Sequence, residues 1–244
     1  MDIFNRVNRL VGPDAMDALR RARVIVFGVG GVGSWTAEAL VRTGIGHITI
    51  VDADIVAESN INRQLMATTA TVGQSKVLTL RSRLIEISPD TGVVAIERRY
   101  TASAAADFRL DEFDYVVDAI DSLADKALLI VNATASRARL VSSMGAAMKM
   151  DPTRVRVDEF WKVKGCPLAA ALRRRFKRGE AAPRRKFRCV YSDELLPNLG
   201  DAADQSGAMT YGKVAVNGAL CHITAIFGMT LAGLVVEDIV RKNR

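Results

Sequence analysis

Short apolar runs alternate with helical repeats along the first 145 residues of the chain. The run Arg23-Val-Ile-Val-Phe27 is rich in β-branched residues and ends in glycines, which is typical of a buried parallel strand. Later segments carry apolar side chains at helical spacing, so we expect helices after residue 32, over 75–87 and over 128–135. This alternation predicts an α/β fold with a Rossmann-like, doubly wound, mostly parallel sheet. Further strands are expected at 47–52, 93–96, 115–118 and 140–143.

The pattern changes after residue 150. Residues 154–158 alternate charged and apolar side chains, as expected of a half-exposed strand. Residues 214–236 hold no formal charge and are long enough to span a bilayer. Polar residues such as Asn217 and His222 interrupt them, and many small residues suit close helix packing. We therefore expect a buried helix without membrane insertion. The predicted division is an ATP-binding part, 1–150, and a basic antiparallel and helical extension, 151–244.

Composition places the chain among globular proteins, and its charge is concentrated in one segment. The 244 residues are 49% hydrophobic and 25% charged, with a formal net charge of +7. Between Lys162 and Arg188 there are eleven basic residues and one acidic residue. Such a block favours a nucleic-acid partner, although a solvated loop without a partner has the same charge. The candidate RNA contacts are Arg173, Arg174, Arg175, Lys177, Arg178, Arg184, Arg185 and Lys186.

The three cysteines and the first residues bear on the compartment. Cys166, Cys189 and Cys221 form no CxxC pair, which favours a reducing environment. The first residues show no apolar signal region, so we expect a cytoplasmic protein. Cys189 follows several cations that could lower the pKa of its thiol, but we favour a structural or accessory role over a nucleophilic one.

A glycine-rich turn follows the first predicted strand. Gly28, Gly30, Gly31 and Gly33 allow close approach of the backbone to a phosphate at the start of a helix. Asp52 closes the second strand, where an acceptor for ribose hydroxyls is usual. These residues alone fit NAD and ATP equally.

Polar residues beyond the second strand favour ATP. A triphosphate needs several cations because its oxygens gain charge as the bond at the α-phosphorus breaks. Arg63 and Lys76 could supply two, and Asp121, after a later strand, could bind Mg²⁺. An NAD-dependent oxidoreductase would leave these three unexplained. The remaining candidate ligand-binding residues are Asp54, Asn60, Gln64 and Ser122.

Together these motifs resemble the ThiF/MoeB/ubiquitin-activating-enzyme superfamily of adenylating enzymes. The resemblance covers about residues 5–145 and rests on the glycine turn, Asp52-x-Asp54, Ser59-Asn60-x-x-Arg63-Gln64, Lys76 and Asp121. Within the superfamily the chain is most similar to the tRNA threonylcarbamoyladenosine dehydratases. Residues 39–46, 118–122, 151–153 and 167–173 carry that closer match.

The resemblance implies an ATP-dependent cyclisation of threonylcarbamoyladenosine beside the tRNA anticodon, through an acyl-adenylate. It implies ATP and Mg²⁺ as cofactors and a tRNA carrying the modified base as partner. It also implies a homodimer in which Arg9, with Arg6 one turn away, reaches the partner's ATP site. Arg63, Lys76, Asp121 and Arg9 would be the catalytic residues, with Asp121 on the metal.

Two departures limit the alternative, an adenylyltransferase for a ubiquitin-like sulfur carrier. Many such relatives carry two CxxC pairs for zinc, and this sequence has none. Ser122 also stands where those relatives commonly have asparagine. The resemblance also allows a sulfur-relay protein as a partner. A further alternative is a non-enzymatic tRNA-binding module with a decayed nucleotide site, and the intact set of glycine turn, acid, cations and metal ligand argues against it.

Overall fold

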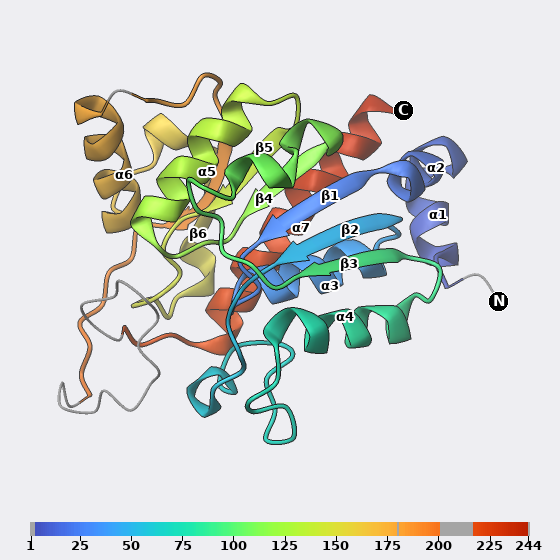
Figure 1. Cartoon of the computed structure of the whole chain (residues 1–244), viewed down its shortest axis with the longest axis horizontal. Coiled ribbons are helices and arrows are strands. Elements are labelled where there is room, and N and C mark those ends of the chain that lie inside the picture. The colour runs from blue at the N-terminus through green and yellow to red at the C-terminus, as the bar shows by residue number, and fades with distance from the viewer. Residues whose placement is uncertain (1–2, 180, 201–216, 244) are drawn as a thin grey trace.

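The computed structural model describes residues 3–179, 181–200 and 217–243, and it confirms the predicted α/β class. One seven-stranded sheet has the order β3-β2-β1-β4-β5-β7-β6 (Figure 1). All neighbouring strands are parallel except β7 and β6, which form the antiparallel pair of the extension. The strands are β1 (Arg23–Phe27), β2 (His47–Val51), β3 (Gly92–Ile96), β4 (Tyr115–Asp118), β5 (Arg139–Ser143), β6 (Val155–Glu159) and β7 (Arg188–Ser192).

Helices cover both faces of the sheet, as the doubly wound prediction requires. One face packs against α2, α3, α4 and α7, where apolar side chains such as Val26 and Ile50 join Leu40, Leu80 and Phe227. The opposite face packs against α5 and α6 through side chains that include Phe27. The helices are α1 (Asn5–Val11), α2 (Pro13–Arg21), α3 (Gly33–Arg42), α4 (Lys76–Ile87), α5 (Leu123–Ala135), α6 (Pro167–Arg178) and α7 (Cys221–Lys242).

The expected C-terminal helix is α7, although residues 214–216 of the predicted segment lie outside the described residues. By length and composition it is the one described helix that could cross a membrane, and more than half of its apolar window is buried. A Cβ on Gly228 would lie 2.5 Å from the carbonyl oxygen of Val32, so α7 approaches the start of α3 very closely. Thr36 Oγ1 donates to the Gly228 carbonyl oxygen at 3.1 Å. The small residues of α7 therefore serve packing within this chain.

The division at residue 150 does not coincide with a break in the sheet or the core. Residues beyond it supply β6 and β7 to the same sheet and α7 to the same core as α3. The strand β7 and the helices α1 and α2 were not expected from the pattern. The part of the basic block after α6 leads directly into β7. A division of roles between the two parts stays a prediction.

Candidate functional site

The carboxyl ends of β1 and β4 meet at the point where the strand order reverses. Crossovers from β1 lead towards β2 and β3, whereas β4 begins the other half of the sheet. In open α/β sheets this switch point is where a crevice for ligands forms. The glycine turn follows β1 and the segment with Asp121 follows β4, so the sheet brings both motifs to one place.

The glycine turn has the backbone geometry that its sequence predicts. Gly28 has φ +82°, and a Cβ on it would lie 2.8 Å from the carbonyl oxygen of Ala119. A Cβ on Gly33 would lie 1.8 Å from the Gly28 carbonyl oxygen, so only glycine fits there. The helix α3 begins at Gly33 without a side-chain cap, and the Ser34 N–H donates to the Gly30 carbonyl oxygen. The N-terminus of a helix favours the binding of anions such as phosphate.

Asp52 joins the glycine turn to the end of β2. Its Oδ2 accepts a hydrogen bond from the Val29 N–H at 2.8 Å, and its Oδ1 accepts one from the Asp54 N–H at 2.9 Å. Burial raises the pKa of the Asp52 carboxyl, and the nearby Lys76 ammonium opposes that rise. An ionised carboxylate has further lone pairs, so Asp52 can still accept from a ribose hydroxyl.

Lys76 is placed at this edge by a short pairing of two loops. Ile55 and Ser75 form a β-bridge, and the Lys76 N–H donates to the Asp54 carbonyl oxygen. The Lys76 side chain is only 6% exposed, and its Nζ lies 2.9 Å from Asp54 Oδ2. Asp54 is itself exposed, so it can give up part of this contact to a phosphate without being left as a buried, unpaired charge.

The loop between β2 and α4 presents Arg63 next to Asp121. Trp35 of α3 holds the loop by donating from Nε1 to the Arg63 carbonyl oxygen at 3.2 Å. Arg63 Nη1 donates to the Ser59 carbonyl oxygen at 2.9 Å and to Asn62 Oδ1 at 2.7 Å. Burial lowers the pKa of the Arg63 guanidinium, and the nearby Asp121 carboxylate opposes this.

Gln64 places a buried polar group beside the glycine turn. Its side chain is 6% exposed, and its buried Oε1 has no hydrogen-bond partner within the described residues. A Cβ on Gly30 would lie 3.7 Å from Gln64 Nε2, so the amide borders the glycine turn. A buried polar atom without a partner costs free energy that a bound ligand can recover. Asn60 has a different role, because its Oδ1 accepts from the Ala57 N–H within the loop.

The Asp121 segment is supported by an ion pair that the sequence pattern did not predict. Asp121 is exposed just after β4, and Ser122 occupies the N-cap position of α5 without a side-chain capping bond. Behind them, Lys126 Nζ lies 2.8 Å from Asp118 Oδ2, and both side chains are fully buried. A lysine on the apolar face of α5 and an aspartate ending an apolar strand were the available signals.

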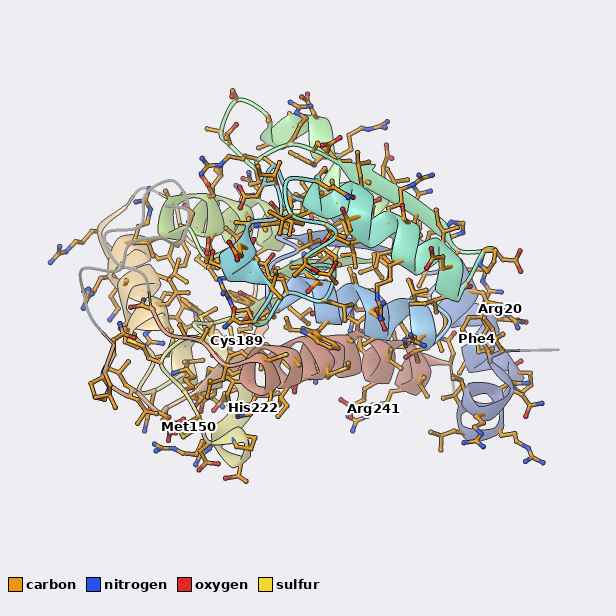
Figure 2. The ribbon with its side chains drawn as sticks, turned by 90° about the horizontal axis from the view of Figure 1, so that it is seen from below. Phe4, Arg20, Met150, Cys189, His222 and Arg241 are labelled. Carbon is orange, nitrogen blue, oxygen red and sulfur yellow. The ribbon has the colours of Figure 1, made fainter. Side chains whose placement is uncertain are left out.

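Arg9 lies far from this site within its own chain. It is exposed on α1, which packs against α2, and α2 leads into the amino end of β1. In Figure 2, Phe4 and Arg20 mark the N-terminal helices at the opposite end of the molecule from His222 and Met150. The start of α7 lies beside the site, since a Cβ on Gly31 would be 3.2 Å from Thr224.

The basic block is divided between exposed and structural side chains. Most of its arginines and lysines are exposed on or just after α6. Arg173 is half-buried and donates to the Phe160 carbonyl oxygen at 3.1 Å. Arg185 binds the carbonyl groups at the end of α5, including those of Thr134 (2.9 Å) and Ala138 (2.8 Å). Arg185 therefore acts as a helix cap, a role that its place in a charged run does not reveal.

Cys189 and His222 lie outside the nucleotide site, and the structure gives each a defined setting. Cys189 is fully buried in β7, and burial raises the pKa of its thiol well above the ordinary value, so the structural role is supported. His222 is exposed, with Nε2 3.0 Å from the Met150 carbonyl oxygen (Figure 2). Among the described residues, no three His, Cys, Asp or Glu side chains gather as metal ligands, so no zinc site of the sulfur-carrier type is present there.

Known proteins match the chain over nearly its whole length. A tRNA threonylcarbamoyladenosine dehydratase of Bacillus subtilis is 38% identical over 242 residues, which are 98% of this chain and 94% of that protein. The crystal structure of an Escherichia coli tRNA N6-threonylcarbamoyladenosine dehydratase in complex with ATP superposes with a TM-score of 0.86. It is 34% identical and covers 98% of this chain and 94% of its own. A molybdopterin-synthase adenylyltransferase of E. coli is 32% identical over 77% of this chain and 70% of its own length. The ThiF family model matches residues 4–242, and the chain belongs to the ThiF family.

Proposed function

We propose that this chain is an ATP-dependent tRNA threonylcarbamoyladenosine dehydratase. The observation that carries the proposal is the convergence at the β1/β4 switch point of the glycine turn, Arg63, Lys76 and Gln64, whose Oε1 has no hydrogen-bond partner among the described residues. The near full-length similarity to dehydratases, one of them solved with ATP, supports the substrate class. We expect the cytoplasm as its location, because tRNA is modified there.

The first step would activate the carboxylate of the modified base. A carboxylate oxygen attacks the α-phosphorus of ATP, and the bond from that phosphorus to the bridging oxygen of the β-phosphate breaks. Pyrophosphate leaves with the bonding electrons, and an acyl-adenylate remains. Arg63 and Lys76 would stabilise the charge that grows on the leaving phosphates, in a site where burial strengthens each interaction.

The second step would close the ring. A nucleophilic atom of the same modified base attacks the acyl carbon, and AMP leaves with one of the former carboxylate oxygens. A proton is lost from the nucleophile, so the balance is dehydration of the base coupled to conversion of ATP into AMP and pyrophosphate. AMP is a far better leaving group than hydroxide, which is the reason for the adenylation.

Asp121 is the candidate ligand for Mg²⁺ in this proposal. Its carboxylate is exposed just after β4, and Mg²⁺ is usually held by one or two carboxylates together with substrate phosphates. When bound, Mg²⁺ would neutralise phosphate charge. Asp52 would hold the ribose, and the N–H groups at the start of α3 would contact phosphate oxygens.

The proposal includes a homodimer and an RNA surface. Because α1 lies at the far end of its own sheet, Arg9 could act in catalysis only at the site of a second copy. The exposed cations of the basic block would contact the tRNA backbone, with Arg174, Arg175, Lys177 and Arg178 on α6 as the main candidates.

The test measures pyrophosphate release from ATP and Mg²⁺ with three possible acceptors. These are tRNA carrying threonylcarbamoyladenosine, the same tRNA without the modification, and a ubiquitin-like carrier ending in Gly-Gly. We expect release with the first alone, accompanied by loss of 18 mass units from the modified nucleoside. Release only with the carrier would instead establish the sulfur-carrier activity. No release with any acceptor would refute adenylation.

A further inference from the structure

The segment between β4 and α5 is tied down by the buried Asp118–Lys126 pair. Lys126 Nζ lies 2.8 Å from Asp118 Oδ2 and also donates to the Ile120 carbonyl oxygen at 2.9 Å. The other carboxylate oxygen, Asp118 Oδ1, accepts from the Ile120 N–H at 3.1 Å. The pair therefore binds both backbone polar groups of Ile120, the residue directly before Asp121.

The same segment supports the glycine turn from behind. A Cβ on Gly28 would lie 2.8 Å from the Ala119 carbonyl oxygen, so these two backbones are in direct contact. Any shift of Ala119 and Ile120 would change the space available to the phosphate-binding turn. Ser142 of β5 completes the arrangement by donating from Oγ to Asp118 Oδ2 at 2.7 Å.

Stability alone does not account for this ion pair. Burying two charges costs desolvation free energy, and apolar side chains of similar volume often serve a core equally well. A fully hydrogen-bonded pair instead selects one backbone arrangement, because other arrangements leave buried charges unsatisfied. Here the selected backbone carries Asp121 and touches Gly28, which are both parts of the candidate site.

We propose that Lys126 and Asp118 are positioning residues that set the 119–122 segment, and through it Asp121 and the Gly28 turn, for binding of ATP. The inference rests on the proposed function, and neither side chain needs to touch the nucleotide. Lys126 acts through the Ile120 carbonyl group, and Asp118 acts through the Ile120 N–H.

The test separates positioning from stability with a neutral double variant. Lys126→Met alone would leave the Asp118 charge buried and unpaired, so we expect it to lower the Tm. Lys126→Met combined with Asp118→Leu removes both charges and the acceptor of the Ile120 N–H, and its Tm should lie above that of Lys126→Met alone. Lys149→Met is the matched control, since Lys149 is also a buried lysine but donates to the Glu194 carbonyl oxygen.

Two readouts are measured on the full chain: hydrogen exchange of residues 119–122, and the Kd for ATP with Mg²⁺ by calorimetry. In the double variant we expect faster exchange of the Ile120 amide and about tenfold weaker ATP binding, which corresponds to about 1.4 kcal/mol. The Lys149→Met protein should match the unchanged protein in both. Should the double variant not fold, Ser142→Ala removes one hydrogen bond from Asp118 and should give smaller shifts in the same directions.

Unchanged exchange, or faster exchange with unchanged ATP affinity, would overturn the positioning role. Failure of the unchanged protein to bind ATP would refute the proposed function and with it a role in ATP binding. Exchange at Ile120 would still show whether the pair holds the segment, so the two failures are distinguishable.

Discussion

Arginines lie at both ends of the parallel strands, but their partners differ. We call the side where the strands begin the amino edge and the side where they end the carboxyl edge. At the amino edge a cavity of about 500 Å³ is bordered by Arg139, Arg188 and Arg241. Arg139 lies 2.6 Å from Asp238, and Arg241 lies 2.7 Å from Glu237, which also faces Arg188 at 3.6 Å. The carboxylates of α7 therefore neutralise the cations of this cavity.

At the carboxyl edge the polar groups keep capacity to bind a ligand. Lys76 is paired with an exposed aspartate, and Arg63 bonds a carbonyl oxygen and an amide oxygen. Gln64 keeps a buried oxygen without a partner in the described part of the chain. The comparison teaches that the volume of a hollow does not locate the site, whereas incompletely satisfied polar groups beside a glycine turn do.

The largest contrast should come from removing one cation at each edge. Lys76→Ala or Arg63→Ala should lower the rate of pyrophosphate release by about 10²–10³-fold, because each cation stabilises transition-state charge. Arg139→Ala should leave that rate unchanged, since its partner is Asp238 at the other edge. Steady-state release assays on the three proteins measure this. Equal losses in all three would remove the distinction between the edges.

Two glycine substitutions compare the glycine turn with the exposed face of α7. Gly33→Ala should destabilise the protein by at least about 2 kcal/mol and abolish ATP binding, because its Cβ would lie 1.8 Å from the Gly28 carbonyl oxygen. Gly233→Ala is the control: a Cβ there meets nothing within 4 Å on α7, so we expect a gain of about 0.5–1 kcal/mol. Thermal unfolding and calorimetry with ATP give both results. Normal ATP binding by Gly33→Ala would contradict the described turn.

The structural role of the amino edge predicts that the contribution of Asp238 to stability depends on pH. Burial acts to raise the pKa of Asp238, but hydrogen bonds from Tyr115 and Lys242 and the charges of Lys242 and Arg139 outweigh it, so the pKa is lowered. A carboxyl with a lowered folded-state pKa adds stability above its unfolded pKa of about 4 and loses it as the pH falls through the folded value. Asp238→Asn should therefore cost about 1–2 kcal/mol at pH 7 and less near pH 3.

Chemical unfolding at both pH values measures that difference. Glu237→Gln, on the same helix turn, is the companion variant, and its side chain is more exposed than that of Asp238. A cost that stays constant with pH would show that the Asp238 charge is not what stabilises this edge. Pyrophosphate release should be unchanged in both variants.

The sequence predicts those strands and turns that depend on the residues within them. β1, β2 and β4 are apolar runs. The turn after β1 needs glycine because a Cβ at Gly28 or Gly33 would clash with nearby backbone atoms. The sequence indicates Arg63 and Lys76 as cations for a triphosphate, and the likeness to a known family then gives these ordinary charges a catalytic role. β7 escaped prediction because this short run after a basic segment pairs with β5 and β6, which both lie about thirty residues or more earlier in the chain.

Lys126 and Arg185 escaped prediction for a related reason. The predicted helical segment covers residues 128–135 only, whereas α5 begins at Leu123 and includes Lys126 on its buried face. Its partner Asp118 and the carbonyl oxygen of Ile120 meet it only once β4 and α5 are packed. Arg185 likewise caps a helix that ends about fifty residues earlier in the chain. Charge patterns do not reveal such long-range partners.

The smallest expected effect concerns the basic block, in which some arginines are exposed on α6 and Arg185 caps α5. Arg174, Arg175 and Arg178 are exposed on α6, so replacing all three with alanine should weaken tRNA binding about tenfold at moderate salt. The slope of log affinity against log salt should also flatten, by about one for each phosphate that no longer binds an arginine. Arg173 is left in place because its guanidinium bonds Phe160.

Arg185→Ala is the matched control for that experiment. It also removes an arginine from the basic block, but the Arg185 guanidinium donates to carbonyl oxygens at the end of α5. It should lower the Tm. It should change the slope of log affinity against log salt by less than one third of the change in the triple variant. Filter binding across a salt series, with unmodified and modified tRNA, measures both slopes. If the triple variant keeps the original slope, α6 is a solvated face, and the tRNA backbone must contact the chain elsewhere.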